Sequence, residues 1–358
     1  MQIYKKMTRN GAFTEKNDEK YMRRCIQLAR NGQAGAAPNP MVGAVIVCDG
    51  KIIGEGYHRR CGGPHAEVNA IRSVRRPELL ERSTIYVSLE PCAHYGKTPP
   101  CADLIIEKRI PRCVVGCRDS FEKVDGLGIK KLRDAGVEVV VGVLEKECQE
   151  LNRRFFTYHT SKRPFVTLKW AQSSDGIIGQ NAEQKKSQQC ADNDGTNGSA
   201  GRRVVFSTAL TTTLVHRMRA LSDAILVGGR TALADNPSLT VRSWHGKNPL
   251  RVVIDTHDSL PSTLALFNEE AETLVWKDND LHALMDELYG RKVQTLMVEG
   301  GAEVLHRFIE AGLWDEIRVE TAPVVLGTGV KAPSLPEARL VSTDTIDGNE
   351  IRCFRRKM

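Results

Sequence analysis

A histidine, a glutamate two residues later, and two cysteines separated by eight residues stand out in the first third of the chain. They are His65, Glu67, Cys92 and Cys101. One imidazole and two thiolates give a catalytic zinc ion its three protein ligands and leave the fourth position open. Glu67 is poorly suited as a fourth ligand but well suited to carry protons for a bound water. We therefore predict a catalytic zinc site with these four residues.

Local sequence supports the metal interpretation. A proline directly precedes both His65 and Cys101, as proline often opens a helix, and a thiolate at a helix start is stabilised by the positive helix end. Two thiolates cancel the charge of the ion, and the neutral site still acidifies its water. A structural zinc site is the alternative. It would need a fourth ligand, for which His94 and Cys61 are candidates.

The cysteine spacing differs from that of most zinc nucleobase deaminases. Those enzymes carry H-x-E followed by P-C-x-x-C, and their glutamate is not a zinc ligand. Here Cys92 is followed by Ala-His-Tyr, so the close cysteine is absent and Cys101 must reach back to the site. Together, the elements APNPMVGAVIV, PHAEVNA and EPCAHYGKTPPC resemble the deaminase half of the bifunctional riboflavin-biosynthesis deaminase/reductases.

That resemblance implies a cytidine-deaminase-like domain that acts on diaminohydroxyphosphoribosylaminopyrimidine. Water would attack the ring carbon that bears the exocyclic amine, Glu67 would transfer protons, and ammonia would leave. The family's substrate contacts would fall on Asn39, His58, Lys97 and Thr98. Lys97 is also chemically sensible, because a ribose phosphate needs a cation near it.

The second half of the chain resembles the reductase half of the same family. The resemblance is carried by LKWAQSSDG, RALSDAILVGGRTALADNPSLTVR, PLRVVID and MVEGGAEVLHRFIEAGLWDEI. It implies a dihydrofolate-reductase-like fold that uses NADPH to reduce the ribosyl group to a ribityl chain. Substrate contacts would fall on Lys169, Arg219, Leu239, Arg242 and Glu299, with Lys169 and Glu299 as catalytic residues. Cofactor contacts would fall on Gln172, Thr231, Asp235, Thr256, Gly300, Gly301, Ala302 and Glu303.

Some of these residues also stand out without the resemblance. VEGGAEVLHRF predicts a strand, a glycine pair and a helix, an arrangement that lets backbone amides approach a pyrophosphate; it lacks the full G-x-G-x-x-G fingerprint. RTALADNPSLTVR predicts a polar loop that presents Thr231, Asp235 and Arg242. Either Arg230 or Arg251 could recognise a 2′-phosphate, and the sequence does not choose between them.

One segment departs from the family pattern. Family members carry a serine and a tryptophan just before the helix that bears Arg219, whereas this chain has GRRVVFSTA. Val205 or Phe206 stands where the tryptophan would flank the cofactor. A deaminase joined to a non-catalytic or altered second domain is therefore an alternative function.

The elements that position these residues predict an α/β protein of two domains. An opening hairpin around Asp49-Gly50, followed by alternating helices and strands, predicts a mixed sheet covered by helices in the N-terminal zinc domain. The second half also alternates strands and helices. We expect a flexible tail at 1–17, a zinc deaminase domain at 18–160 and a reductase domain at 161–358, with a flexible insert at 180–203.

Composition narrows the functional class. The chain has 358 residues, a formal net charge of +7 and ten cysteines. The charge suits an anionic small molecule and lacks the concentrated basic surface of a nucleic-acid binder, which disfavours a nucleic-acid-editing deaminase. With no apolar stretch long enough for a membrane and no secretory signal, we expect a cytoplasmic enzyme whose partner is a phosphorylated pyrimidine. The resemblance adds a homo-oligomer.

Overall fold

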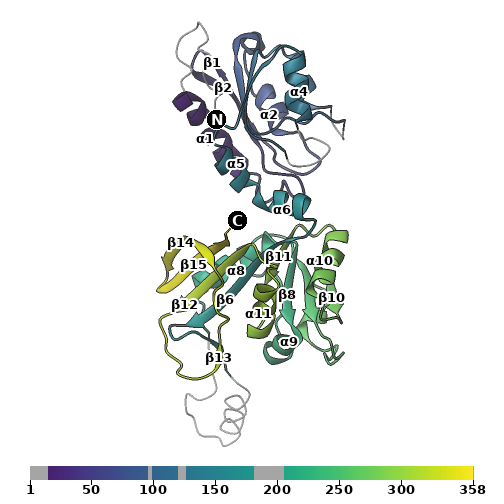
Figure 1. Cartoon of the computed structure of the whole chain (residues 1–358), viewed down its shortest axis with the longest axis vertical. Helices are drawn as coiled ribbons and strands as arrows, with labels where there is room; N and C mark the ends of the chain where they lie inside the picture. The colour runs from purple at the N-terminus through teal and green to yellow at the C-terminus, as the bar shows by residue number, and fades with distance from the viewer. Residues whose placement is uncertain (1–14, 96–98, 120–125, 181–204, 358) are drawn as a thin grey trace, which may run out of the picture. The chain divides into compact units, whose positions relative to one another are not determined.

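The computed structural model describes residues 15–95, 99–119, 126–180 and 205–357. The chain forms two compact units, 1–161 and 162–358, each with its own sheet (Figure 1). Residues 15–17, which the sequence assigns to a tail, are already helical. Lys97, Thr98 and nearly all of the expected 180–203 insert lie outside the described residues.

The first unit is built on a mixed five-stranded sheet in the order β2-β1-β3-β4-β5. β1 is antiparallel to both of its neighbours, and β3, β4 and β5 run parallel. The strands are β1 (Gly43–Cys48), β2 (Lys51–Tyr57), β3 (Thr84–Leu89), β4 (Arg112–Cys117) and β5 (Glu138–Val141). The helices are α1 (Glu15–Arg30), α2 (Ala66–Arg72), η1 (Pro77–Arg82), α3 (Cys101–Glu107), α4 (Leu127–Asp134), α5 (Glu145–Leu151) and α6 (Arg153–Ser161).

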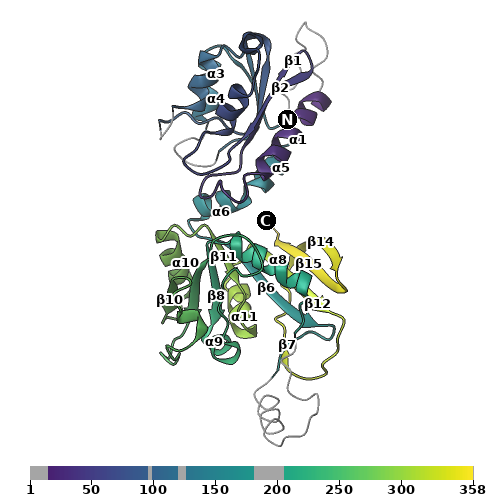
Figure 2. The same cartoon turned by 180° about the vertical axis from the view of Figure 1, so that it is seen from behind.

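Helices cover both faces of this sheet (Figures 1 and 2). Alternate residues of a strand point to opposite faces, so Ala44 and Ile46 pack with α2, α3 and α4, whereas Val45 and Val47 pack with α1 and α5. Because both faces are covered, β1, β3 and nearly all of β4 are fully buried. The sheet is therefore a rigid support for residues that follow its strands.

Two connections in this unit show what determines the path of the chain, which is local sequence in the first and a tertiary contact in the second. Asp49 and Gly50 both have positive φ, 50° and 73°, as the predicted two-residue hairpin requires. The sequence pattern over 144–159 predicts one helix, but the structure has two, α5 and α6, divided at Asn152. Its side-chain amide accepts a hydrogen bond from the Met41 N–H at 2.8 Å and donates one to the Met41 carbonyl at 2.9 Å, so tertiary contacts break the helical pattern.

The second unit contains an eight-stranded sheet in the order β10-β9-β8-β11-β6-β12-β15-β14. The strands from β10 to β12 are parallel, and β15 and β14 are antiparallel. The strands of this sheet are β6 (Phe165–Ser173), β8 (Ala224–Gly228), β9 (Leu250–Ile254), β10 (Thr273–Trp276), β11 (Thr295–Val298), β12 (Glu316–Ala322), β14 (Ala338–Ile346) and β15 (Asn349–Arg356). Two further strands, β7 (Ile177–Gly179) and β13 (Val330–Lys331), form a separate two-stranded sheet. The helices are α8 (Ala209–Ala220), α9 (Gly229–Asp235), η2 (Ala265–Phe267), α10 (Leu281–Gly290) and α11 (Ala302–Glu310).

The strand order reverses between β8 and β11. After β8 the chain moves outward through β9 and β10, and then returns to place β11 between β8 and β6. In open parallel sheets, ligands bind beyond the carboxyl ends of the strands at such a reversal. This topology therefore marks the ends of β8 and β11 as a ligand site.

The structure corrects three expectations for this unit. Thr231 and Asp235 lie on the short helix α9 and not on a loop, because the chain turns into a helix directly at Gly229 and leaves it at Asn236, which adopts left-handed φ. The sequence EIRVETAPVVLG predicts one strand over 316–327, but β12 ends at Ala322. The hairpin β14–β15 was not predicted, because nearly all of β14 is exposed or half-buried and its sequence shows no alternation. None of the described helices is both long and apolar enough to cross a membrane.

Candidate active sites

The predicted metal ligands of the first unit come together. His65 is the N-cap of α2, Cys92 follows β3, and Cys101 is the first residue of α3. The His65 Nδ1 atom lies 3.6 Å from the Cys92 Sγ and 3.3 Å from the Cys101 Sγ. In a tetrahedral zinc site, sulfur and nitrogen ligands stand about 3.6 to 3.8 Å apart. The three donor atoms therefore fit a zinc ion with little adjustment.

This cluster contains three potential ligands within 4.8 Å of one another and, in the described parts of the chain, no fourth. His94 and Cys61, which would complete a structural site, are both exposed and outside the cluster. Three protein ligands leave one coordination position for water, as catalytic zinc sites do.

The protonation of the cluster suits metal binding. The pKa of the Cys92 thiol is lowered to about 4, mainly by a hydrogen bond from Cys101, whose own pKa is raised by the same hydrogen bond. A hydrogen bond to Cys92 also raises the pKa of His65. Cys101 and His65 thus hold the protons that a bound metal ion would displace.

Glu67 lies in the first turn of α2, next to the ligand cluster. Its side chain is only 3% exposed, and this burial, with the negative charge of Cys92, raises its pKa to about 7. A carboxyl group with a pKa near neutrality can both accept and return a proton. Glu67 is therefore placed and protonated as a proton carrier should be.

The predicted substrate contacts Asn39 and His58 form a fixed pair beside the cluster. The His58 Nδ1 is 3.1 Å from the Pro64 carbonyl, which can only accept, so His58 carries its proton on Nδ1. Its Nε2 then accepts from the Asn39 amide nitrogen at 3.1 Å. The His58 ring packs edge-on against that of His65, with ring centroids 5.5 Å apart. Two of the four predicted contacts therefore adjoin the metal ligands.

Sequence reasoning missed Glu90, a buried carboxylate two residues before Cys92. Glu90 is 4% exposed, and among the described residues its hydrogen-bond donors are all backbone N–H groups. The donors are Asp119 at 3.4 Å, Gly126 at 3.2 Å, Gly128 at 3.0 Å and Ile129 at 3.2 Å. Glu90 thus ties the segment that carries Cys92 to the start of α4. An acidic residue directly after a buried strand was the available signal.

In the second unit, the glycines after β8 and β11 approach each other closely. A Cβ on Gly300 would lie 3.3 Å from the Gly228 nitrogen, and one on Gly301 would lie 2.8 Å from the Thr231 Oγ1. The Gly301 N–H donates to that Thr231 oxygen at 3.0 Å. Four predicted cofactor residues, Thr231 and 300–302, therefore lie together where the strand order reverses.

The other predicted cofactor residues lie around this edge with different partners. Thr256 follows β9 and its hydroxyl contacts His257 at 3.0 Å, while Gln172, near the end of β6, accepts from the Trp170 indole at 2.8 Å. Asp235 is the last residue of α9. The carboxyl ends of parallel strands share one edge, so Thr256 and Gln172 border the same edge as the glycines.

The two candidate arginines have different roles. Arg251 is 1% exposed, and its guanidinium donates to Asn268 Oδ1 and to the backbone carbonyls of Ser238, Ala265, Asn268 and Ala271. Arg251 holds loops together and is too deeply buried to contact a ligand. The Arg230 side chain is 90% exposed and pairs with Glu303 at 2.6 Å. Glu303 follows Gly300 and Gly301, the glycine pair that is called the glycine cradle from here on. Only Arg230 is open to a bound nucleotide.

A charged cluster lies next to the cradle. The Arg219 guanidinium donates to both Glu299 oxygens, at 3.1 and 2.8 Å, and to the Thr240 carbonyl at 3.1 Å. Burial lowers the pKa of Lys169, and the charge of Glu299 opposes that effect. The predicted residues Lys169, Arg219 and Glu299 thus form one ionic group.

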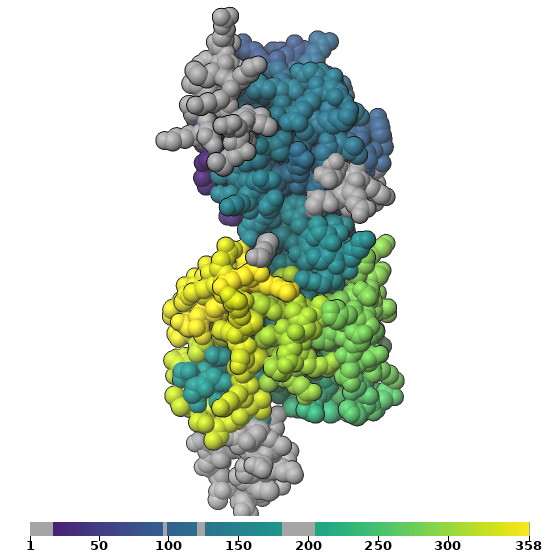
Figure 3. Space-filling model, viewed as in Figure 1, coloured from purple at the N-terminus to yellow at the C-terminus, as the bar shows by residue number. Residues whose placement is uncertain are grey.

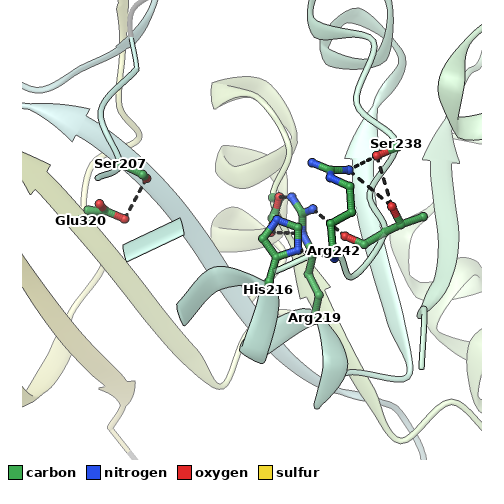
Figure 4. Close-up of polar contacts among 8 residues, drawn as sticks. Ser207, His216, Arg219, Ser238, Arg242 and Glu320 are labelled. Atoms are coloured by element: carbon green, nitrogen blue, oxygen red, sulfur yellow. Dashed lines mark hydrogen bonds and ion pairs between the residues drawn. The ribbon is translucent and has the colours of Figure 1, made fainter. Parts of the chain in front are cut away.

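Of the remaining predicted substrate residues, Arg242 lies beside Arg219 (Figure 4). The Arg242 N–H donates to His216 Nδ1 at 3.0 Å, and its guanidinium donates to the Ser238 hydroxyl. His216, which sequence reasoning did not single out, is 3% exposed and lies one turn before Arg219 on α8. Leu239 packs its side chain into a hydrophobic cluster at 2% exposure and has φ of 55°, so only its backbone can face a ligand.

Comparison with known proteins covers both units. A family model described as "Cytidine and deoxycytidylate deaminase zinc-binding region" matches residues 15–117. A second, described as "RibD C-terminal domain", matches residues 164–349.

Similar full-length proteins exist in several bacteria. "Riboflavin biosynthesis protein RibD" of Aquifex aeolicus is 38% identical over 341 residues, which span 89% of this chain and 90% of that protein. Its namesake in Escherichia coli is 33% identical over 350 residues, spanning 88% and 90%. A crystal structure from Thermotoga maritima, of a diaminohydroxyphosphoribosylaminopyrimidine deaminase/5-amino-6-(5-phosphoribosylamino)uracil reductase, is 35% identical. It has a TM-score of 0.80 and covers 95% of this chain and 99% of that one. A structure of Acinetobacter baumannii RibD is 30% identical with a TM-score of 0.83, covering 96% and 100%.

Proposed function

This chain belongs to the family of bifunctional riboflavin-biosynthesis deaminase/reductases, and from this premise we propose which residues perform each of its two reactions. The first unit deaminates 2,5-diamino-6-ribosylamino-4(3H)-pyrimidinone 5′-phosphate, and the second reduces the ribosyl group of the product to ribityl. The observation that carries this proposal is the joint presence of a three-ligand zinc cluster beside Glu67 and a glycine cradle beside Lys169 and Glu299.

In the deaminase reaction, His65, Cys92 and Cys101 would hold a zinc ion, which would supply Lewis acidity at the site. Glu67 takes the proton from the attacking water and delivers it to the departing amine, which leaves as ammonia. Asn39 and His58 orient the pyrimidine, and Lys97 and Thr98 bind its phosphate end.

In the reductase reaction, the residues of the cradle would hold NADPH, which would supply the hydride that C1′ of the sugar needs. The C1′–O4′ bond breaks, and Lys169 gives a proton to O4′, so one hydride and one proton add across that bond. Glu299 holds the sugar hydroxyls, and Arg219, Arg242 and the Leu239 backbone bind the ribose phosphate. The cradle at 300–303, with Thr231, Gln172, Asp235 and Thr256, binds the cofactor.

Arg230 gives the preference for NADPH over NADH. Its exposed guanidinium adjoins the cradle, and guanidinium groups bind phosphate with two hydrogen bonds. Arg230→Ala should raise KM for NADPH by about tenfold or more and leave KM for NADH within a factor of two. Arg291→Ala, which removes a surface arginine with carboxylate partners elsewhere, is the matched control. An equal loss with both cofactors would contradict this role.

One assay tests the whole proposal. Zinc-loaded protein receives the ribosylaminopyrimidine phosphate and NADPH, and ammonia release and the absorbance of NADPH are followed in parallel. Ammonia followed by matched oxidation of NADPH is expected. Ammonia without oxidation would favour the alternative of an altered second domain, which the missing tryptophan near Val205 motivates; Val205 is 74% exposed.

We also propose that the protein works in the cytoplasm as a homo-oligomer. Among the described residues, no cysteine is in a disulfide, and thiol ligands need a reducing compartment. β14 belongs to the C-terminal part of the chain that is yellow in Figure 3 and is the outer strand of its sheet. It exposes Leu340 and Val341, at 52% and 41%. Apolar edge strands tend to pair with another chain. Light scattering that gives the mass of one chain at micromolar concentration would refute the oligomer.

A further inference from the structure

Lys169 has a positively charged neighbour on the next strand. In the parallel pair β6–β12, Lys169 lies opposite Arg318, so both side chains project from the same face of the sheet. Lys169 is half-buried, and Arg318 is 7% exposed. Two cations this close, away from bulk water, disfavour each other's charged form. Lys169 therefore needs nearby negative charge to stay protonated.

Glu299 supplies only part of this charge. Both of its oxygens already accept hydrogen bonds from the Arg219 guanidinium, at 3.1 and 2.8 Å. Arg219 and Glu299 are each 11% exposed, so the pair is largely removed from solvent and neutral as a unit. A second carboxylate is required to balance Lys169 and Arg318.

Glu320 is that second carboxylate. It lies two residues after Arg318 on β12, hence on the same face, and is completely buried. Its oxygens accept hydrogen bonds from neutral groups. One donor is the Ser207 hydroxyl at 3.1 Å (Figure 4), and the other is the Asn349 amide at 2.7 Å. The closest Arg318 nitrogen is 3.7 Å away, beyond hydrogen-bonding distance. Glu320 is therefore fixed in place by neutral donors, and its only recorded ion pair among the described residues is the long one with Arg318, without a hydrogen bond.

The donors that hold Glu320 come from distant parts of the unit. Asn349 opens β15 and also donates to the Phe206 carbonyl at 2.8 Å, and Ser207 directly precedes the N-cap of α8. The segment that departs from the family pattern is thus anchored on the same carboxylate. The Lys169 ammonium, by contrast, has no hydrogen-bonding partner among the described residues, so it is free to bond a ligand.

We propose that Glu320 is a positioning residue of the reductase, whose buried carboxylate supplies the counter-charge that keeps the Lys169 ammonium protonated beside Arg318. This inference rests on the proton-donor role of Lys169 proposed above. Glu320 acts through Lys169 and does not touch the substrate.

The directions of the pKa shifts of Lys169 and Glu320 agree with this role of Glu320. Burial lowers the pKa of Lys169, Glu299 and Glu320 raise it, and Arg318 and Arg219 lower it further. Burial alone would raise the pKa of Glu320, but hydrogen bonds from Thr211 and Asn349 and the charge of Lys169 hold it below its ordinary value, so Glu320 is ionised. His216, which faces Glu299 from α8, has its pKa lowered by burial and adds no charge at neutral pH.

The test is the pH dependence of NADPH oxidation. A proton donor must be protonated, so the rate falls as pH rises through the pKa of Lys169. Glu320→Gln keeps the size and an acceptor oxygen but removes the charge. In the pH profile of this variant, the fall in rate at high pH, here called the alkaline limb, should move to lower pH by about 1 to 3 units. Activity should be recovered at pH values below that limb. Ammonia release should keep its pH profile.

Two further variants complete the test: one should shift the pH profile in the opposite direction, and the other is a control that should not shift it. Arg318→Met removes the competing cation and should move the limb to higher pH; combined with Glu320→Gln, it should return the limb toward its original position. Ser207→Ala removes a neutral hydrogen bond and should leave the limb in place. A limb that stays fixed in Glu320→Gln and in Arg318→Met would overturn the proposal.

The underlying assignment of Lys169 is tested separately. Lys169→Met should abolish the alkaline limb together with most of the rate. If Lys169→Met keeps the original limb, another group titrates and the role of Lys169 fails. If Lys169→Met removes the limb but Glu320→Gln does not move it, the role of Glu320 alone fails.

Discussion

In the first unit, the proposed roles are divided between three side chains that would hold the metal and a carboxyl group, Glu67, that would move protons. Three donors and Glu67 come from the start of α2, the end of β3 and the start of α3. Since Glu67 is not a ligand, binding of the metal and transfer of protons can be separated by mutation.

Glu67→Gln should keep zinc and lose deamination. The amide cannot accept a proton from water, and loss of a general acid–base commonly reduces a rate by about 10² to 10⁴-fold. Zinc content by elemental analysis and ammonia release check this. NADPH oxidation with the deaminated compound supplied directly should be unchanged. Ammonia release near the parent rate would assign proton transfer to another group.

Cys101→Ser should lower zinc content and ammonia release together. A hydroxyl is a much weaker zinc ligand than a thiolate, and the cluster has no spare donor among the described residues. Cys117→Ser is the matched control, since Cys117 is equally buried but packs on the opposite face of the sheet with α1. Full zinc content in Cys101→Ser would place the third ligand elsewhere.

Residues within the continuous motifs were predictable from sequence, whereas their supports were not. The zinc ligands and the glycine pair have characteristic neighbours in the chain. Glu90 and Glu320 have partners 29 to 39 and 29 to 113 positions away, so no local pattern reveals them. Arg230 and Arg251 looked equivalent in sequence, and only burial separates them.

At the scale of elements, the second site depends on the contact between α9 and the start of α11. The Gly301 N–H reaches the Thr231 hydroxyl because neither Gly300 nor Gly301 has a side chain in the way. β8, β11 and α11 were expected from the alternation of apolar segments and the position of the glycines, whereas the segment that forms α9 was expected to be a loop. β14 was not expected, because a strand with little buried surface has no apolar period.

Gly301→Ala should weaken NADPH binding. Its Cβ would stand 2.8 Å from the Thr231 Oγ1, so Thr231 must move and its hydrogen bond is lost. One such bond is worth about 1 to 1.5 kcal/mol, which corresponds to a roughly tenfold increase in KM for NADPH. Gly290→Ala has open space around its Cβ and is the control. An unchanged KM would remove Gly301 from the cofactor site.

At the scale of the whole molecule, each unit has its own sheet and hydrophobic cores. Two clusters of buried residues fill the first unit and two others fill the second. Such units are able to unfold as separate cooperative transitions. The zinc ligands all belong to the first unit, so the metal should stabilise only that unit.

Removal of zinc should therefore lower one of two melting transitions. A ligand present at a hundred times its Kd stabilises its domain by about 2.7 kcal/mol, which shifts Tm by about 5 to 10 °C in a domain of this size. Calorimetry with and without chelator measures both transitions, and the transition of Cys101→Ser should not respond. An equal shift of both would show that the units unfold together.

Glu90 has a consequence for how this enzyme could be re-engineered. One of its oxygens receives the N–H groups of Asp119 and Gly126, and the other those of Gly128 and Ile129. The connection between Asp119 and Gly126 thus begins and ends on one carboxylate, which also secures the approach to Cys92. Each doubling of a loop's length costs only about 0.6 kcal/mol. A change in the length of this connection should therefore cost little stability as long as Glu90 holds both of its ends.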